Sequence, residues 1–254
     1  MAARRRLPSL ALLLGALLLA AALGLGAWLG SGRAPAQGEA PVGLFTTLPI
    51  LWNEADDVAG LLNDTAPPHW ARAVLARRGP IAALDTLAGP EGYGPLERLR
   101  HLVIAQPRPL SPGENVALDT WVRGGGHLLL IADPALTEQS RFALGDPRRP
   151  QGLVLLSPIL RRWGLELQFD DVQPPGEREV RAGGLVLPVN LPGRFAIAGA
   201  GNCRLWGEGL AVTCAVGQGR VVALADAAVL ERSDADGNRA TALSGLLDLA
   251  FAAR

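Results

Sequence analysis

Residues 101–134, HLVIAQPRPLSPGENVALDTWVRGGGHLLLIADP, contain the pattern that decides the fold class of this chain. Two continuous apolar runs, residues 101–106 and 128–132, are typical of strands buried on both faces of a sheet. Between them, Ser111 is suited to be an N-cap, Pro112 to be the first helical residue and Glu114 to close a capping box. Three glycines then end the helix. Strand, helix and strand in this order predict a parallel βαβ unit.

The flanking sequence predicts further elements around this unit. Leu118, Trp121 and Val122 recur at helical spacing and are expected to face the core. More strands are expected at residues 42–48, 81–84, 165–169 and 220–225. Helices are expected from residues 53, 67 and 157, and over residues 241–252. Residues 135–156 show little periodicity, and we interpret them either as a functional loop or as a surface insertion.

The composition of the 254 residues excludes several classes of protein. Lysine and arginine together number 24, as do aspartate and glutamate, so the formal net charge is zero. A neutral chain without a clustered basic patch does not favour nucleic acid as a partner. All of these cations are arginines, which excludes a Walker A loop because that motif requires lysine. The sequence also lacks a Gly-x-Ser-x-Gly nucleophile turn.

The N-terminal segment predicts a membrane anchor. Arginines at positions 4–6 precede an uncharged apolar run, residues 7–30, which as a helix would be about 36 Å long and therefore long enough to cross a bilayer. We interpret residues 1–6 as cytoplasmic, residues 7–30 as one transmembrane helix, residues 31–41 as a linker and residues 42–254 as an extracytoplasmic domain. This places the protein in a bacterial inner membrane with its main domain in the periplasm. A cleaved signal peptide is the alternative.

Two cysteines are placed to form a disulfide. If Glu208 and Gly209 form a two-residue hairpin turn, counting outward puts Cys203 directly opposite Cys214. Facing strand residues lie about 4.5–5.5 Å apart at Cα, which is within disulfide range. We therefore predict a cross-strand disulfide, with two buried thiols as the alternative.

Four of the expected strands end in polar residues. These are Thr46 with Thr47, Gln106, Asp133 and Asp226. The carboxyl ends of parallel strands meet at one edge of a sheet, where α/β proteins place their ligand sites. The five residues are thus a candidate edge for a ligand or partner. The alternative is structural, because strand ends reach water there and an aspartate can simply cap the next turn.

The sequence predicts no metal and no cofactor. His69, His101 and His127 are far apart, and the last two each begin an expected strand, at the edge opposite to the candidate edge. Residues 234–238, DADGN, resemble part of a calcium loop but lack the distal glutamate of an EF-hand. We interpret them as an ordinary polar turn.

Three segments carry a resemblance to a known family. They are LFTTLPILWNE at residues 44–54, the stretch at 101–134, and GQGRVVALADAAVL at 217–230, followed by Asn238. With the N-terminal anchor, they resemble the membrane-anchored proteins of unknown function in the ABC-type uncharacterised transport system and gliding-motility ABC-transporter auxiliary family. The resemblance implies a three-layer, mostly parallel α/β fold of the class I glutamine amidotransferase-like or flavodoxin-like type. Catalytic relatives carry a cysteine in the turn after a central strand. That turn holds Asp133 here, which implies that amidotransferase activity is absent.

These observations lead to three functional hypotheses. The favoured one is a non-catalytic periplasmic domain that binds a partner or ligand, as an accessory of an ABC-type transport system whose permease and ATPase would be its partners. The rival is a hydrolase-like enzyme that uses Asp133 and Asp226 with a metal or water. The third is a purely structural tether, which predicts no concave site at the strand ends.

Overall fold

The computed structural model describes residues 40–54, 67–89, 94–234 and 236–252. The expected transmembrane helix and nearly all of the linker lie outside these residues, as does most of the helix expected from residue 53. Within the described ranges, no helix is both long enough and apolar enough to cross a membrane.

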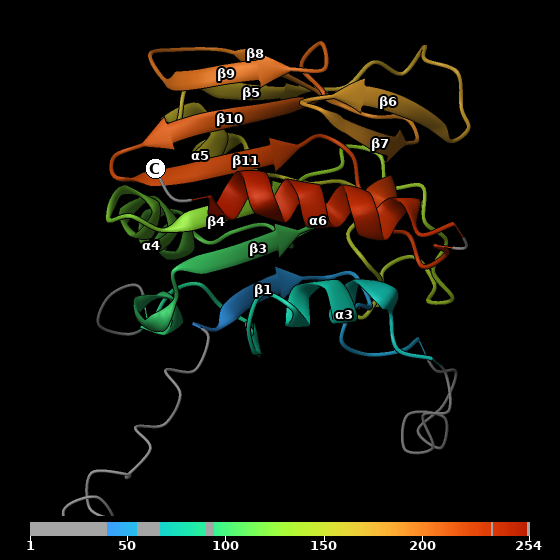
Figure 1. Cartoon of the computed structure of the whole chain (residues 1–254), viewed down its shortest axis with the longest axis horizontal. Helices are drawn as coiled ribbons and strands as arrows, with labels where there is room; N and C mark the ends of the chain where they lie inside the picture. The colour runs from blue at the N-terminus through green and yellow to red at the C-terminus, as the bar shows by residue number, and fades with distance from the viewer. Residues whose placement is uncertain (1–39, 55–66, 90–93, 235, 253–254) are drawn as a thin grey trace, which may run out of the picture. The chain divides into compact units, whose positions relative to one another are not determined.

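A seven-stranded sheet forms the middle layer of the domain (Figure 1). Its strand order is β2-β1-β3-β4-β11-β10-β9, and neighbours from β2 to β11 run parallel. β10 and β9 extend the sheet through antiparallel pairs. The strands are β1 (Val42–Thr46), β2 (Ile81–Ala83), β3 (His101–Ala105), β4 (His127–Ile131), β9 (Asn202–Trp206), β10 (Ala211–Val216) and β11 (Gly219–Leu224). The predicted α/β class and mostly parallel sheet are confirmed.

The predicted βαβ unit is present together with its caps. β3 and β4 pair in parallel with His101 beside His127, and α4 (Pro112–Arg123) connects them. Ser111 Oγ accepts a hydrogen bond from Glu114 N at 3.2 Å, and Glu114 Oε2 accepts one from Ser111 N at 2.9 Å. These two bonds form the predicted capping box, and Gly124 ends the helix as expected.

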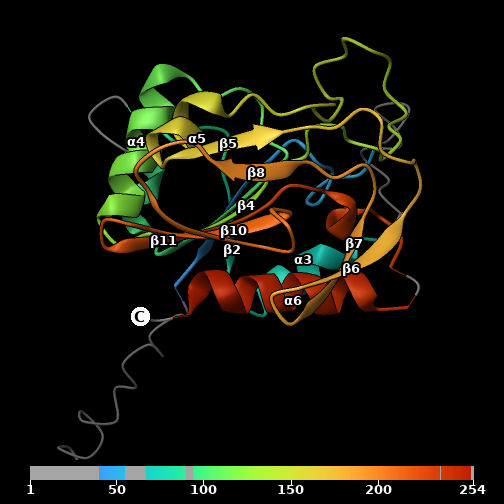
Figure 2. The same ribbon diagram turned by 90° about the horizontal axis from the view of Figure 1, so that it is seen from above.

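Helices cover both faces of the sheet and give three layers (Figure 2). α4 and α5 (Ser157–Arg162) pack on one face, whereas α3 (Trp70–Ala76) and α6 (Asn238–Phe251) pack on the other. Successive residues of β4 alternate between the two hydrophobic cores: Leu128 lies in the α4 core and Leu129 in the α6 core. Because both sides of the strand are buried, its sequence is a continuous apolar run.

Two small antiparallel sheets and a hairpin complete the domain. The two-stranded sheets pair β5 (Leu165–Gln168) with β8 (Arg194–Ile197), and β6 (Arg178–Ala182) with β7 (Leu185–Val189). Short 3₁₀ helices occur at η1 (Gly94–Arg98) and η2 (Ala228–Leu230). In the β9–β10 hairpin, Glu208 and Gly209 occupy the turn with φ of 56° and 90°. Cys203 then faces Cys214, and the two form a disulfide, which confirms the predicted pairing.

The closing helix starts earlier than the sequence predicts. α6 begins at Asn238 rather than at residue 241. The carboxylate of Asp234 accepts hydrogen bonds from Arg239 N at 2.9 Å and from Ala240 N at 3.2 Å, so it satisfies N–H groups of the first turn. Both carboxylate oxygens of Asp234 therefore have main-chain partners.

Candidate ligand-binding site

The carboxyl edge of the parallel strands carries all five candidate residues. Thr46 ends β1, Gln106 follows β3 directly, and Asp133 and Asp226 follow β4 and β11 by two residues. Thr46 Oγ1 accepts a hydrogen bond from Leu48 N at 2.9 Å. The edge is therefore assembled as the sequence predicts, and the partners of each side chain decide what it can do.

Gln106 joins the ends of β3 and β4. Its backbone is left-handed, with φ of 43°. Its side-chain Nε2 donates to Asp133 O at 3.1 Å, and its Oε1 accepts from Asp133 N at 3.0 Å. Nε2 also donates to Gln151 O at 2.7 Å, and Thr47 Oγ1 accepts from Gln151 N at 3.1 Å. These bonds fasten the long loop of residues 135–156 to the ends of β1 and β3.

Asp133 and Asp226 are fully buried, and main-chain N–H groups occupy their oxygens. Each accepts a hydrogen bond from the N–H two residues ahead, at 2.7 Å for Asp133 and 2.6 Å for Asp226. The second oxygen of Asp133 accepts from Ala227 N at 3.0 Å, and that of Asp226 from Asn190 N at 2.8 Å. Both carboxyl groups thus hold together segments that are distant in sequence.

The two carboxyl groups also influence each other's protonation. Burial raises the pKa of Asp133 to about 6. Burial, and next the charge of Asp133, raise the pKa of Asp226 well above the ordinary value for aspartate. The pair therefore keeps a proton in a pH range where exposed aspartates are ionised.

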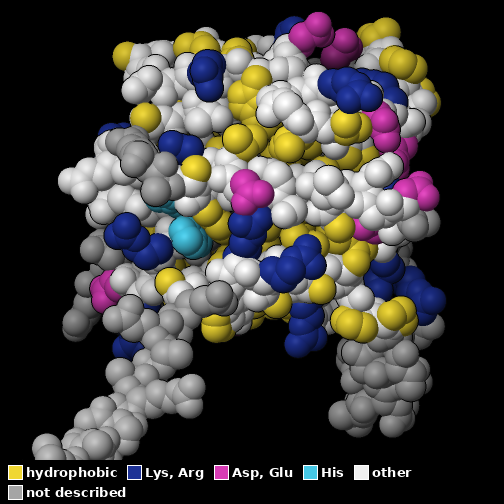
Figure 3. Space-filling model, in the orientation of Figure 1, with side chains coloured by type: hydrophobic (Ala, Val, Ile, Leu, Met, Phe, Trp, Pro, Cys, Tyr) yellow, Lys and Arg dark blue, Asp and Glu magenta, His cyan; other side chains and the backbone are white. Residues whose placement is uncertain are grey.

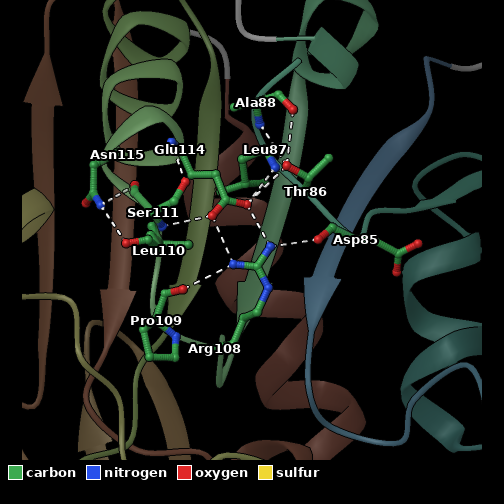
Figure 4. Close-up of polar contacts among 10 residues, drawn as sticks. All are labelled: Asp85, Thr86, Leu87, Ala88, Arg108, Pro109, Leu110, Ser111, Glu114 and Asn115. Carbon is green, nitrogen blue, oxygen red and sulfur yellow. Dashed lines mark hydrogen bonds and ion pairs between the residues drawn. The ribbon is translucent and has the colours of Figure 1, made fainter. Parts of the chain in front are cut away.

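A second polar network closes the part of this edge near β2 and α4 (Figure 4). Arg108 donates to both oxygens of Glu114, at 2.9 Å and 2.8 Å, and to Asp85 O at 2.8 Å. Glu114 Oε1 also accepts from Leu87 N at 3.2 Å. The hydrogen bonds from Arg108 outweigh burial and lower the pKa of Glu114 to about 2. This network ties the residues after β2 to the start of α4.

A cavity of about 310 Å³ lies between the carboxyl end of β1 and the loop of residues 135–156. Its lining consists of Thr46, Thr47, Trp52, Asn53, Phe142, Pro147 and Arg148. The rings of Trp52 and Phe142 lie 6.1 Å apart, and the guanidinium of Arg148 lies 4.2 Å from the centre of the Phe142 ring. Two aromatic rings, a cation and two threonines therefore surround one space.

The strand order explains why the cavity lies there. From β1 the chain passes to β2 on one side, and then to β3 on the other side of β1. At such a switch point the connections leave in opposite directions and open a crevice outside the carboxyl ends of the strands. Among the five candidate residues, Thr46 and Thr47 line the cavity. Gln106, Asp133 and Asp226 are buried and do not line the cavity; their hydrogen bonds hold segments of the chain together.

The sequence did not identify the aromatic and cationic walls of this cavity. Trp52 lies in the segment after β1, and Phe142 and Arg148 lie in the loop of residues 135–156, which has no helix or strand. A signal was present in the length and position of that loop, which follows a central strand. Without the fold, nothing in the loop distinguishes Phe142 from the neighbouring Leu144, which is 89% exposed.

A larger hollow of about 660 Å³ lies over the small sheets, between β5, β6, β8 and the β9–β10 turn. Half of its lining residues are polar or charged, and these include Asp170, Arg178, Arg194 and Glu208. We place the candidate site in the smaller cavity because it coincides with the switch point and has aromatic walls.

His101 and His127 lie away from the site, whereas His69 lines a neighbouring hollow that Trp52 and Asn53 also border. His101 and His127 begin β3 and β4 at the opposite edge, as predicted, with ring centres 5.9 Å apart. His69 is the N-cap of α3 and contacts Leu230 O at 3.0 Å, and burial lowers its pKa to about 4. Among the residues that the structure describes, no group of three or more His, Cys, Asp or Glu side chains is arranged to hold a metal ion.

No family model matches this sequence, and no curated protein matches it. Several solved structures are similar in architecture. A ThuA-like protein from Bacteroides uniformis has a TM-score of 0.45 and 10% identity, over 87% of this chain and 93% of its own. A cytoplasmic protein from Salmonella typhimurium has a TM-score of 0.45 and 14% identity, over 71% of this chain and 83% of its own. A β-galactosidase from Bacillus circulans sp. alkalophilus has a TM-score of 0.44 and 13% identity, over 85% of this chain and 32% of its own. The chain spans about a third of the glycosidases that it matches.

Proposed function

We propose that this protein is a non-catalytic, membrane-anchored domain that faces the periplasm and binds a ligand or a partner's side chain in the cavity at the end of β1. The observation that carries the proposal is the cavity with Trp52, Phe142 and Arg148 at the switch point of the sheet. The anchor rests on the apolar run of residues 7–30.

The walls of the cavity suit a small group that is flat or apolar and carries an acceptor or a negative charge. Aromatic rings supply large apolar contact areas, and the guanidinium of Arg148 supplies several donors in one plane. Arg148 already pairs with Asp146 at 2.8 Å, and its side chain is 55% exposed. A volume of about 310 Å³ is at the small end of ligand pockets, so the cavity fits one side chain or a small metabolite.

The role as an accessory of an ABC-type transport system is the finer part of the proposal. Its support is the resemblance of residues 44–54, 101–134 and 217–230 to proteins of that kind, together with the predicted anchor. We expect the permease and its ATPase to accompany the intact protein when cells are crosslinked and the protein is purified in mild detergent. Recovery of the intact protein without either would refute this role and leave ligand binding to be tested alone.

A photo-crosslinking experiment tests the cavity itself. A photoreactive amino acid replaces Pro147, which lines the cavity, and the control replaces Leu144, which is in the same loop and 89% exposed but does not line the cavity. We expect a specific adduct from position 147 only, and we expect Phe142→Ala to abolish it. Equal adducts from both positions, or an adduct that survives Phe142→Ala, would contradict binding in the cavity.

The hydrolase alternative keeps one supporting observation, namely two buried carboxyl groups with raised pKa values at the strand ends. We favour binding because main-chain N–H groups already occupy the oxygens of Asp133 and Asp226. A hydrolytic activity that disappears in Asp226→Asn, with circular dichroism and thermal unfolding unchanged, would reverse this preference.

A further inference from the structure

The amino-terminal edge of the sheet, opposite to the cavity, is rich in arginine. The register aligns Val42, His101, His127 and Arg220 at this edge. The carbonyl of Arg100 accepts a hydrogen bond from His127 N at 2.9 Å. We call the arginines at this edge the arginine edge; they are Arg77, Arg78, Arg98, Arg100, Arg123 and Arg220.

The arginine edge carries more positive than negative charge. Within it, Arg78 pairs with Asp248 at 2.6 Å and Arg123 with Asp119 at 2.9 Å. Arg77, Arg98 and Arg100 are exposed, and none of their guanidinium groups makes a hydrogen bond or ion pair with the described part of the chain. The whole chain has no net charge, so this positive surplus is local. On the face shown in Figure 3, histidine surface lies among groups of arginine side chains.

A hollow of about 320 Å³ lies at the arginine edge. Arg100, His101, His127, Gln218 and Phe251 contribute to its lining. Guanidinium groups bind phosphate oxygens with two parallel hydrogen bonds, which makes exposed arginines beside a hollow suitable for phosphate-bearing groups.

The first described strand begins at this edge. Val42 is the first residue of β1, and β1 begins at the arginine edge. Residues 31–41 connect it to the proposed anchor, and a linker of that length spans about 40 Å at most when fully extended. The chain therefore enters the domain at the arginine edge, and not at the cavity edge.

We infer that the arginine edge docks on anionic phospholipid headgroups of the membrane that holds the anchor, so that the cavity at the opposite edge is presented to the periplasm. This inference rests on the membrane anchor of the proposed function. Each arginine near an anionic surface strengthens binding roughly fivefold. The three exposed arginines together therefore contribute about 100-fold, and salt weakens the effect.

Arginine footprinting of the full chain tests the inference. The intact protein is reconstituted into nanodiscs of phosphatidylcholine with or without phosphatidylglycerol, and phenylglyoxal modification of each arginine is followed by mass spectrometry. We expect modification of Arg77, Arg98 and Arg100 to slow several-fold in the anionic discs and to recover in high salt. Arg148, at the cavity edge, is the matched control, and its rate of modification should be the same in both kinds of disc.

A triple variant supplies the second measurement. Hydrogen exchange of residues 97–101 should slow in anionic discs for the natural chain, and this protection should be lost when Arg77, Arg98 and Arg100 are all replaced by glutamine. Equal modification in both lipids, or protection of Arg148 instead, would overturn the inference. Protection seen only in native membranes, and not in lipid discs, would also overturn it and indicate a protein partner.

The arginine modification experiment also tests headgroup binding independently of the membrane anchor. If the chain fails to enter nanodiscs, the anchor is refuted, and the protein is mixed instead with preformed phosphatidylglycerol vesicles. Slower modification of the three arginines would still support headgroup binding by the arginine edge, whereas an unchanged rate would refute it.

Discussion

Replacing Glu114 with alanine should be among the most damaging single changes away from the hydrophobic cores. The carboxylate is 2% exposed and accepts bonds from Arg108, Thr86 Oγ1, Leu87 N and Ser111 N. Removing it leaves the N–H of Leu87 buried and unpaired, at a cost of about 1–3 kcal/mol. It also removes half of the capping box and the charge-assisted bonds to Arg108. The total loss of unfolding free energy is about 3–5 kcal/mol.

The lowered pKa of Glu114, which arises from the same hydrogen bonds, corresponds to a similar magnitude. The pKa of Glu114 is lowered to about 2 in the folded state, from an ordinary value of 4.5. This shift is worth about 3 kcal/mol of stability. Because the folded pKa is depressed, the stabilisation is complete above the unfolded pKa and is lost as the pH falls through the folded pKa. The relevant window is therefore between about pH 5 and pH 2.

Urea unfolding of the natural chain and of Glu114→Gln and Glu114→Ala, at steps from pH 7 to pH 2, checks this reasoning. Glutamine keeps an acceptor for one N–H but loses the charge, so at pH 7 we expect a loss of about 1.5–3 kcal/mol. The gap between natural chain and glutamine variant should shrink as the pH falls below 5. Arg148→Gln is the control, because that arginine is an exposed ion-pair partner and its replacement should leave the unfolding free energy nearly unchanged. A gap that stays constant with pH, or a loss below 1 kcal/mol for Glu114→Ala, would refute the argument.

Three further predictions concern the framework. The raised pKa of Asp133, about 6, means that Asp133 contributes a loss of up to about 3 kcal/mol of unfolding free energy as the pH rises from 4 to 6. Asp226, whose pKa is also raised, adds a loss of the same sign, so urea unfolding of Asp133→Asn should show a shallower slope than that of the natural chain, and an unchanged slope would refute the assignment to Asp133. Reducing the Cys203–Cys214 disulfide, which joins residues 11 apart, should lower the unfolding free energy by about 3 kcal/mol, measured by comparing unfolding with and without reductant. Alkylation of two thiols in non-reduced protein would show that no disulfide exists. A Cβ at Gly219 would lie 2.0 Å from a main-chain carbonyl oxygen of α4, so Gly219→Ala should lower the unfolding free energy, measured by thermal unfolding, by at least about 1–3 kcal/mol. The control is Gly113→Ala, where a Cβ meets open space and the change should be neutral or stabilising. Equal effects of the two substitutions would refute the steric reason.

Local patterns made much of the fold predictable from the sequence. The capping box at Ser111 and Glu114 and the glycines after Arg123 mark both ends of α4 with side chains that act within one turn. The Glu208–Gly209 turn sets the register of its hairpin, so the position of Cys203 opposite Cys214 follows by counting. In each case a feature spanning a few residues decides the structure.

The candidate site was predictable only in outline. The carboxyl ends of the strands place Thr46, Asp133 and Asp226 at one edge, which follows from parallel pairing alone. Whether a polar side chain there faces a cavity or binds main chain depends on segments distant in sequence. Asn190 N, for example, reaches Asp226, and Phe142 reaches Trp52. Aperiodic loops supply these contacts, and no spacing rule describes them.

The strand order also affects how the chain must be made. β4 ends at Ile131, but β11, which covers its free edge, begins only at Gly219. A chain synthesised from its N-terminus therefore has the apolar edge of β4 unpaired until most of the domain has followed, and such an edge is a template for aggregation. The disulfide hairpin forms from neighbouring residues and can close before β11 emerges. Shortening the chain before Gly219 should accordingly give an aggregating polypeptide and not a smaller domain.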